Sequence, residues 1–208
     1  PSRTDCRTCH TSAGGLAIGF NTPQLNRPRS EDDPRNQIEW WSQLGYFRSP
    51  VTATNTWETL APADDANTSL QHRVRSYLFA NCAQCHQPGG PGRAAWDARI
   101  KTPLESTGLV NAPALDTLGR PGSRIVKPGS LEQSVLYRRI AEWGEHHMPP
   151  LGTTVINQEA VDLLRDWILD ELPQSSAGHN IPPTVTVTAP SDRALIPAGS
   201  TVDRKSVV

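Results

Sequence analysis

The chain has 208 residues, of which 36% are hydrophobic, and its formal charge at neutral pH is −1. This balance argues against nucleic acid as the main partner, because phosphate binding needs an excess of basic side chains. The modest apolar content predicts a small core in each domain, which a bulky cofactor could complete, and no apolar run is long enough to predict a membrane span.

The first predicted domain covers residues 1–61. It holds a Cys-x-x-Cys-His motif, a glycine-rich stretch and one clear helical pattern. We expect this helix to begin near Asp33, with Pro34 in its first turn, and to end at Gly45. The side chains that recur at helical spacing and would form its buried face are Ile38, Trp41 and Leu44.

The second predicted domain covers residues 62–172 and opens with a helix that starts near Ser69 and leads into a second Cys-x-x-Cys-His motif. The expected buried face of this helix consists of Leu70, Val74, Tyr77 and Leu78. Ser130 and Gln133 have the spacing of a capping box, which predicts a helix over residues 131–143.

A final helix is expected over residues 158–172, capped by Asn157 and ended by Pro173. Its apolar stripe consists of Val161, Leu164, Ile168 and Leu172. The sequence therefore predicts a mainly α, loop-rich fold.

The C-terminal tail differs in composition from the rest of the chain. Residues 173–183 read as a linker, and the alternating residues of 184–208 predict two short β-strands. Two strands cannot form a stable sandwich. We therefore expect the truncated beginning of another module and, because residue 1 is a proline rather than a methionine, a chain taken from a longer protein.

All four cysteines lie in two motifs, Cys6-Arg7-Thr8-Cys9-His10 and Cys82-Ala83-Gln84-Cys85-His86. In c-type haem attachment, two thiols at this spacing bond to the porphyrin vinyl groups and the next residue binds the iron through its imidazole. The sequence therefore predicts two covalently attached haem c groups. The attachment residues would be Cys6, Cys9, Cys82 and Cys85, and the proximal ligands His10 and His86.

Three other kinds of site also use paired cysteines: a structural zinc site, redox-active dithiols and local disulfides. None of them requires a histidine directly after both second cysteines. The double motif therefore favours haem over these alternatives.

Met148, the single methionine of the chain, lies in the loop sequence HHMPPLGT between two predicted helices. Its thioether is a soft ligand that favours ferrous iron and raises the potential relative to two imidazoles. The two prolines that follow would stiffen the loop, and a polar turn is a poor place for core packing. We expect Met148 to be the sixth ligand of the haem that His86 binds.

The first haem cannot also take a methionine. In an extended loop His147 would face away from Met148 and could reach a haem docked on the other side. His72 precedes His86 by about 14 residues, or roughly 20 Å of helix. It is therefore too far away to bind the iron of the second haem, but it could bind the iron of the first. An iron without a sixth protein ligand is the third option.

Residues 69–172 resemble a class I cytochrome c domain, with a helix ending in the attachment motif, the segment KPGSLEQSVLYRRI, the ligand loop MPPLG and a closing helix with an aromatic residue. RVRSYLFANCAQCHQPGG and PSRTDCRTCHTSAGGLAIGFNTPQLNR are similar to the two halves of a di-haem cytochrome family of secreted or periplasmic bacterial proteins, often fused to PQQ-dependent, sugar-dehydrogenase-like or carbohydrate-active modules. This resemblance covers about residues 1–172 and implies electron transfer. The tail resembles the opening of a bacterial Ig-like module.

We therefore expect an electron carrier rather than an enzyme, located in the periplasm or secreted, because bacterial haem c assembly operates outside the cytoplasmic membrane. A PQQ-dependent dehydrogenase or a copper polysaccharide oxygenase could be its partner. A di-haem peroxidase with an open first haem is the alternative enzyme, although no catalytic acid is evident near the first motif. A zinc-stapled binding module is the third hypothesis.

Overall fold

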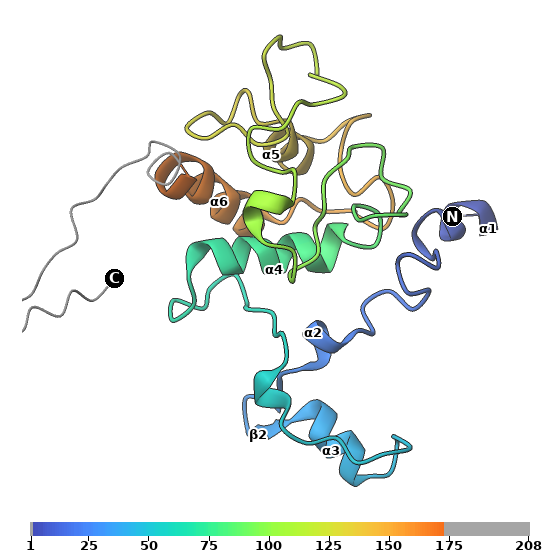
Figure 1. Ribbon diagram of the computed structural model, residues 1–208. Coiled ribbons are helices and arrows are strands. Elements are labelled where there is room, and N and C mark those ends of the chain that lie inside the picture. Colours follow the sequence, from blue (N-terminus) through green and yellow to red (C-terminus); the bar gives the residue numbers. More distant parts are fainter. Residues whose placement is uncertain (1, 173–208) are drawn as a thin grey trace, which may run out of the picture.

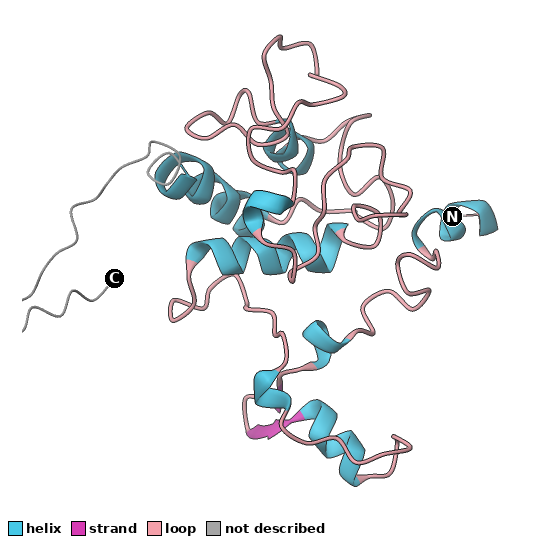
Figure 2. Ribbon diagram, viewed as in Figure 1, coloured by secondary structure: helices cyan, strands magenta, loops and turns pink. Residues whose placement is uncertain are grey.

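The computed structural model describes residues 2–172. The predicted linker (173–183), whose Pro173 is expected to end the last helix, and the predicted Ig-like segment (184–208) lie outside the described residues. An N-terminal region extends away from a compact helical unit that begins with α4 and includes the later helices (Figure 1). Helices and long loops dominate, and the described residues contain a single two-stranded sheet (Figure 2). None of the helices in this part of the chain is long and apolar enough to cross a membrane.

The helical unit is built on α4 (Leu70–Cys82), α5 (Val135–Ala141) and α6 (Gln158–Asp166), which continues as the π-helical turn η3 (Trp167–Glu171). A short 3₁₀ turn, η2 (Leu104–Ser106), lies in the long loop between α4 and α5. Two expected caps are confirmed: the Ser69 side chain accepts the His72 N–H at 3.3 Å, and the Asn157 side chain accepts the Ala160 N–H at 3.1 Å.

The apolar core lies where α4 meets α6 and η3, which are neighbours in space (Figure 1). The predicted faces of these helices are confirmed, since Val74, Leu78, Leu164 and Ile168 are all fully buried. The cluster also includes Trp167, Ile140 and the loop residues Trp96, Leu109 and Val126. Burying each large apolar side chain stabilises the fold by about 1.5–3 kcal/mol. The core thereby fixes the position of the C-terminal end of α4.

The prediction for α5 is wrong at its start. The helix begins at Val135 rather than near residue 131, and the Ser130 side chain accepts the Gln133 N–H at 3.3 Å within a separate turn. The reason is that the Val135 and Leu136 N–H groups bond at 2.9 Å to the carbonyls of Arg124 and Ile125. This loop pairing holds Ser134 extended, so the helix can begin only after it.

The N-terminal region contains α1 (Arg3–Cys9), α2 (Thr22–Leu25), β1 (Pro28–Ser30), β2 (Asp33–Asn36), α3 (Gln37–Gln43) and the 3₁₀ turn η1 (Thr54–Thr56). The helix predicted from Asp33 is wrong in its first turn, because residues 33–36 pair with β1 instead. The Asp33 carboxylate binds the guanidinium groups of Arg29 and Arg35, which stabilises the turn between the strands.

Helix α3 starts at the Asn36 cap, whose side chain accepts the Ile38 N–H at 2.9 Å. Its expected apolar face is only partly covered. Ile38 is buried and Trp41 half-buried, but Leu44 is 54% exposed. This helix therefore packs weakly.

The buried side chain of Asn26 holds the N-terminal region together. Its Nδ2 donates to the carbonyls of Thr54, Trp57 and Glu58 at 3.0, 3.2 and 3.3 Å, and its Oδ1 accepts from Asn36 Nδ2 at 2.7 Å. Within residues 2–61 the structure otherwise buries only Ile38 and Thr54. This region is therefore organised by polar contacts and lacks an apolar centre of its own.

Replacing Leu78 by Ala should lower the free energy of unfolding by about 2–5 kcal/mol, because it leaves a cavity between α4 and the closing helix. Urea unfolding followed by far-UV circular dichroism measures this change. Leu115→Ala is the matched control, since Leu115 is 73% exposed and its loss should change stability by about 0.5 kcal/mol at most. Equal losses for the two variants would contradict the described core.

Candidate functional site

Both Cys-x-x-Cys-His motifs adopt the same local turn at the end of a helix. The His10 N–H bonds to the Cys6 carbonyl at 3.0 Å at the end of α1, and the His86 N–H bonds to the Cys82 carbonyl at 2.8 Å at the end of α4. In each motif one helical turn therefore joins the first cysteine to the histidine. This turn gathers two thiols and one imidazole within five residues of the chain.

The imidazole of His10 is exposed, and its orientation is set by the loop that follows. Its Nδ1 lies 2.5 Å from the Leu16 carbonyl oxygen, which can only accept, so Nδ1 donates this bond. Metal-bound histidines are commonly held by such a bond from the other ring nitrogen to a backbone carbonyl. The His10 ring is thus held in the way that is common for metal ligands.

The imidazole of His86 is held by packing. Its ring stacks on Trp96 with centroids 4.6 Å apart, and a Cβ at Gly92 would lie only 2.7 Å from its Nδ1. Burial lowers the pKa of His86, and the nearby Ala94 backbone opposes this effect. His86 is therefore neutral near pH 7, which leaves one ring nitrogen able to bind a metal.

The four thiols are free in this structure, and their surroundings differ. Cys6 is exposed, whereas burial raises the pKa of Cys82 to about 12. Burial also raises the pKa of Cys85 to about 11, with a further contribution from the adjacent Cys9 thiol. The second motif thus keeps its thiols protonated until well above neutral pH.

The two motifs meet although 77 residues separate Thr8 from Cys85, whose Sγ approaches the Thr8 carbonyl oxygen at 4.0 Å. Gly14 lies between them, because a Cβ there would be 3.1 Å from the carbonyl oxygens of both Cys9 and Gln84. The N-terminal segment thus docks at the C-terminal end of α4. This end also carries His86.

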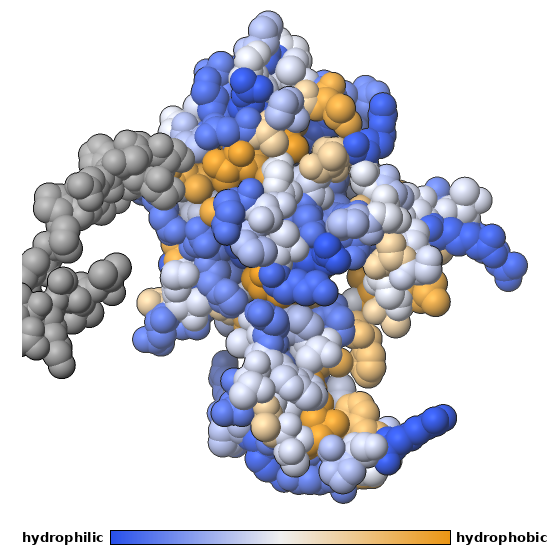
Figure 3. Space-filling view, in the orientation of Figure 1, coloured by the Kyte–Doolittle hydropathy of each residue, from blue (hydrophilic) through white to orange (hydrophobic). Residues whose placement is uncertain are grey.

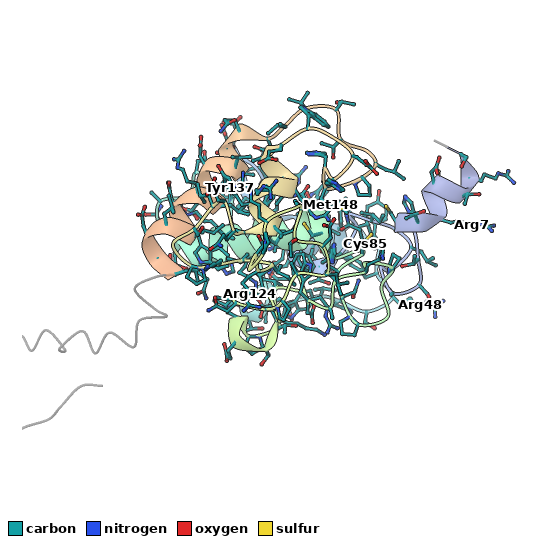
Figure 4. All side chains as sticks on the ribbon, turned by 90° about the horizontal axis from the view of Figure 1, so that it is seen from above. Arg7, Arg48, Cys85, Arg124, Tyr137 and Met148 are labelled. Carbon is teal, nitrogen blue, oxygen red and sulfur yellow. The ribbon has the colours of Figure 1, made fainter. Side chains whose placement is uncertain are left out.

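The loop that carries Met148 is anchored on α5. The Met148 N–H donates to the Arg139 carbonyl at 2.7 Å, and the Arg139 guanidinium donates to the His146 carbonyl at 3.0 Å. The same guanidinium acts on the second motif, since its positive charge contributes to the lowered pKa of His86. In Figure 4 Met148 lies in the helical unit, apart from Arg7 of α1. Arg139 thus holds the methionine loop on α5 from both its carbonyl and its side chain.

His147 is buried, and only one of its two ring nitrogens has a hydrogen-bond partner. Its Nδ1 lies 3.1 Å from the Glu142 carbonyl, its ring packs on Trp143 with centroids 4.3 Å apart, and its buried Nε2 has no hydrogen-bond partner. A buried polar atom without a partner costs about 1–3 kcal/mol. A ring held at Nδ1 by a backbone carbonyl, with no partner at Nε2, is an arrangement common in metal-binding histidines.

His72 lies elsewhere. It occupies the first turn of α4, and its Nε2 is 3.1 Å from the Thr59 carbonyl oxygen. Because α4 has 13 residues, its two ends are about 20 Å apart. The structure therefore separates His72 from both motifs, which meet at the other end.

Exposed apolar side chains follow the first motif and flank Met148. They are Leu16, Phe20, Trp143, Leu151 and Val155, between 40% and 74% exposed. Apolar patches lie open on the face in Figure 3. Side chains of this kind would cover the faces of a porphyrin, so the residues around the motifs fit a haem.

Among residues 2–172, no three His, Cys, Asp or Glu side chains gather as a preformed metal site. Haem c attachment would use a different set, namely the two thiols and one histidine of each motif.

Sequence reasoning missed three residues that shape these motifs, namely Gly14, Gly92 and Trp96. The available signal was that a glycine-rich stretch, SAGG or PGGPG, follows each motif. Close approach of backbone or ring is a common reason for glycine at such a position. No pattern marked Trp96, because its contact with His86 depends on the fold of the loop.

Comparison of the chain with protein-family models, curated proteins and solved structures gives no match.

In the chain prepared without haem, we expect iodoacetamide to alkylate Cys6 first at pH 8, and Cys82 and Cys85 at least about tenfold more slowly, because only the thiolate reacts. Raised pKa values mean that the two slow rates should climb as the pH rises toward 11. Peptide mass spectrometry over time measures each rate. Cys82 reacting as fast as Cys6 would contradict the buried environment.

Proposed function

We propose that this chain is a di-haem c-type cytochrome that carries electrons between a redox enzyme and an acceptor outside the cytoplasm. The observation that carries the proposal is a hydrogen bond that both motifs share, in which the histidine N–H bonds to the first cysteine's carbonyl. A haem supplies the one-electron iron centre. The protein would attach each haem, bind its iron and cover its faces.

The first haem would be attached at Cys6 and Cys9 and ligated by His10. The second would be attached at Cys82 and Cys85 and ligated by His86. The helix that carries the second motif packs on the closing helix, which supports a stable position for this motif. Burial of His86 against Trp96 and Gly92 keeps its ring in one orientation, which supports a stable ligand.

Met148 is the proposed sixth ligand of the second haem. Its backbone is tied to α5 through Arg139, whose charge also reaches His86. A thioether stabilises ferrous iron relative to a second imidazole, which suits a haem of high potential. The exposed Leu151 and Val155 next to it would then pack on the porphyrin.

His147 is the proposed sixth ligand of the first haem, in preference to His72. The unpartnered, buried Nε2 of His147 supports this choice, whereas the Nε2 of His72 already lies at a carbonyl. Ligation would satisfy the one polar atom of His147 that the fold leaves without a bond.

Assembly of haem c in bacteria takes place outside the cytoplasmic membrane, which supports a periplasmic or secreted location. We propose the electron donor or acceptor only as a chemical class of protein. A PQQ-dependent dehydrogenase or a copper polysaccharide oxygenase would exchange single electrons with such a carrier.

Removing one pair of attachment cysteines should remove one haem and leave the other. We expect the Cys6→Ala/Cys9→Ala and Cys82→Ala/Cys85→Ala variants each to bind one haem covalently, as measured by absorbance and intact mass.

The reduced wild-type protein should pass electrons to a small artificial acceptor without sustained turnover of hydrogen peroxide. Rapid peroxide turnover would contradict the carrier function and favour a di-haem peroxidase.

Met148→Ala should lower the potential of the second haem by on the order of 100 mV, because axial ligands set haem potentials over about 0.8 V. His147→Ala should instead convert the first haem from low-spin to high-spin iron, as seen by EPR of the ferric protein. Each variant should leave the other haem unchanged, since the two residues serve different irons.

Leu151→Ala is the control for both ligand variants, because it alters the same loop without removing a ligand atom. A Met148→Ala potential equal to that of the control would contradict thioether ligation. A first haem that stays low-spin in His147→Ala would show that another group is its sixth ligand.

A further inference from the structure

Arg139 on α5 bonds to the loop before this helix and to the loop after it. One guanidinium nitrogen, Nη1, donates to the His146 carbonyl at 3.0 Å, and the other, Nη2, donates to the Asp116 carboxylate at 2.9 Å. The backbone carbonyl of Arg139 also accepts the Met148 N–H at 2.7 Å. A single residue of α5 therefore joins the loop of Asp116 to the loop that carries the methionine.

The Asp116 carboxylate is held in place by its own loop. Its Oδ1 accepts the Leu118 N–H at 2.9 Å, while its Oδ2 bonds to Arg139. The Arg138 guanidinium on α5 in turn donates to the Leu118 carbonyl at 3.4 Å. The bond from the Leu118 N–H and the charge of Arg139 hold the pKa of Asp116 below its usual range, against the opposing effect of burial. Asp116 is therefore an anion near neutral pH.

This ion pair differs from the other one nearby in what it connects. The Arg139 side chain is only 19% exposed, and its planar guanidinium fixes two partners relative to each other. Arg120 and Glu132 form an ion pair at 2.6 Å between two residues of the loop before α5, and their side chains are 45% and 76% exposed. The pair of Arg139 and Asp116 thus spans two loops, whereas the second pair stays within one.

The methionine loop depends on Arg139 for its bonds to α5. The His147 N–H bonds to the Gly144 carbonyl at 3.1 Å, and the His147 Nδ1 lies 3.1 Å from the Glu142 carbonyl, both within the same loop. The hydrogen bonds that reach from residues 146–148 to α5 are the two made by Arg139. Loss of its guanidinium would leave this stretch with its backbone bond alone.

We propose that Arg139 and Asp116 are positioning residues for Met148, because together they hold the methionine loop in place before any ligand is bound. The inference rests on the proposed function, in which Met148 is the sixth ligand of the second haem. A ligand that is already held loses less conformational freedom on binding, so a competitor displaces it less easily. The ion pair would thereby set how firmly the thioether is bound.

Titration of the ferric two-haem protein with free imidazole tests this role, because imidazole competes with the thioether for the iron. The readout is the weak far-red absorption band that is specific to methionine-ligated ferric haem. We expect half of the band to disappear at an imidazole concentration about threefold lower in Asp116→Asn, which removes an ion pair that is half exposed. Arg139→Gln should lower this concentration about fivefold or more, since it also removes the bond to His146.

Glu132→Gln is the matched control, because it breaks the ion pair with Arg120 in the loop before α5. It should leave the imidazole titration unchanged. The midpoint of thermal unfolding, measured alongside, should be the same for Asp116→Asn and Glu132→Gln, so that a general loss of stability does not explain the difference between them.

Equal imidazole titrations of the wild-type protein and Asp116→Asn, with the far-red band present, would overturn the positioning role and leave the proposed function standing. An equal shift in Asp116→Asn and Glu132→Gln would overturn it as well. A wild-type protein with fewer than two haems or without the band would instead contradict the proposed function or its assignment of Met148. If Arg139→Gln does not fold, the comparison of Asp116→Asn with Glu132→Gln still decides.

Discussion

The packing of α4 against the closing helix determines where the second Cys-x-x-Cys-His motif lies, and the first motif docks against that end of α4. Val74 and Leu78 bury one face of α4 against Leu164 and Ile168, and all four side chains are inaccessible to solvent. The C-terminal end of α4 is thereby held rigidly, and with it Cys82 and the turn to His86. A ligand site built on a rigid element can keep its geometry without help from the ligand.

The N-terminal region follows a different physical rule. It has a buried asparagine at its centre and few buried apolar side chains, and several large apolar residues stay exposed. Asn26 ties together the backbone carbonyls of Thr54, Trp57 and Glu58. A covalently bound porphyrin would supply the apolar centre that this stretch of sequence does not contain.

Much of the helical unit could be predicted from the sequence, because the apolar residues of α4 and α6 recur at helical spacing and Ser69 and Asn157 are strong caps. The start of α5 could not, since pairing of Ser134 with Arg124 across the loop overrides the local capping pattern. The pair β1 and β2 was missed for a similar reason, because Pro34 after an aspartate reads as a helix start. The two motifs were evident from spacing alone, but their contact depends on a fold that brings Thr8 to Cys85.

Counting covalently bound haem in the purified protein tests the central claim most directly. The pyridine haemochrome assay, combined with intact mass, measures haem per chain without assumptions about ligands or partners. The account predicts two haems per chain, one on each Cys-x-x-Cys-His motif. A colourless protein that holds zinc at its cysteines would contradict it.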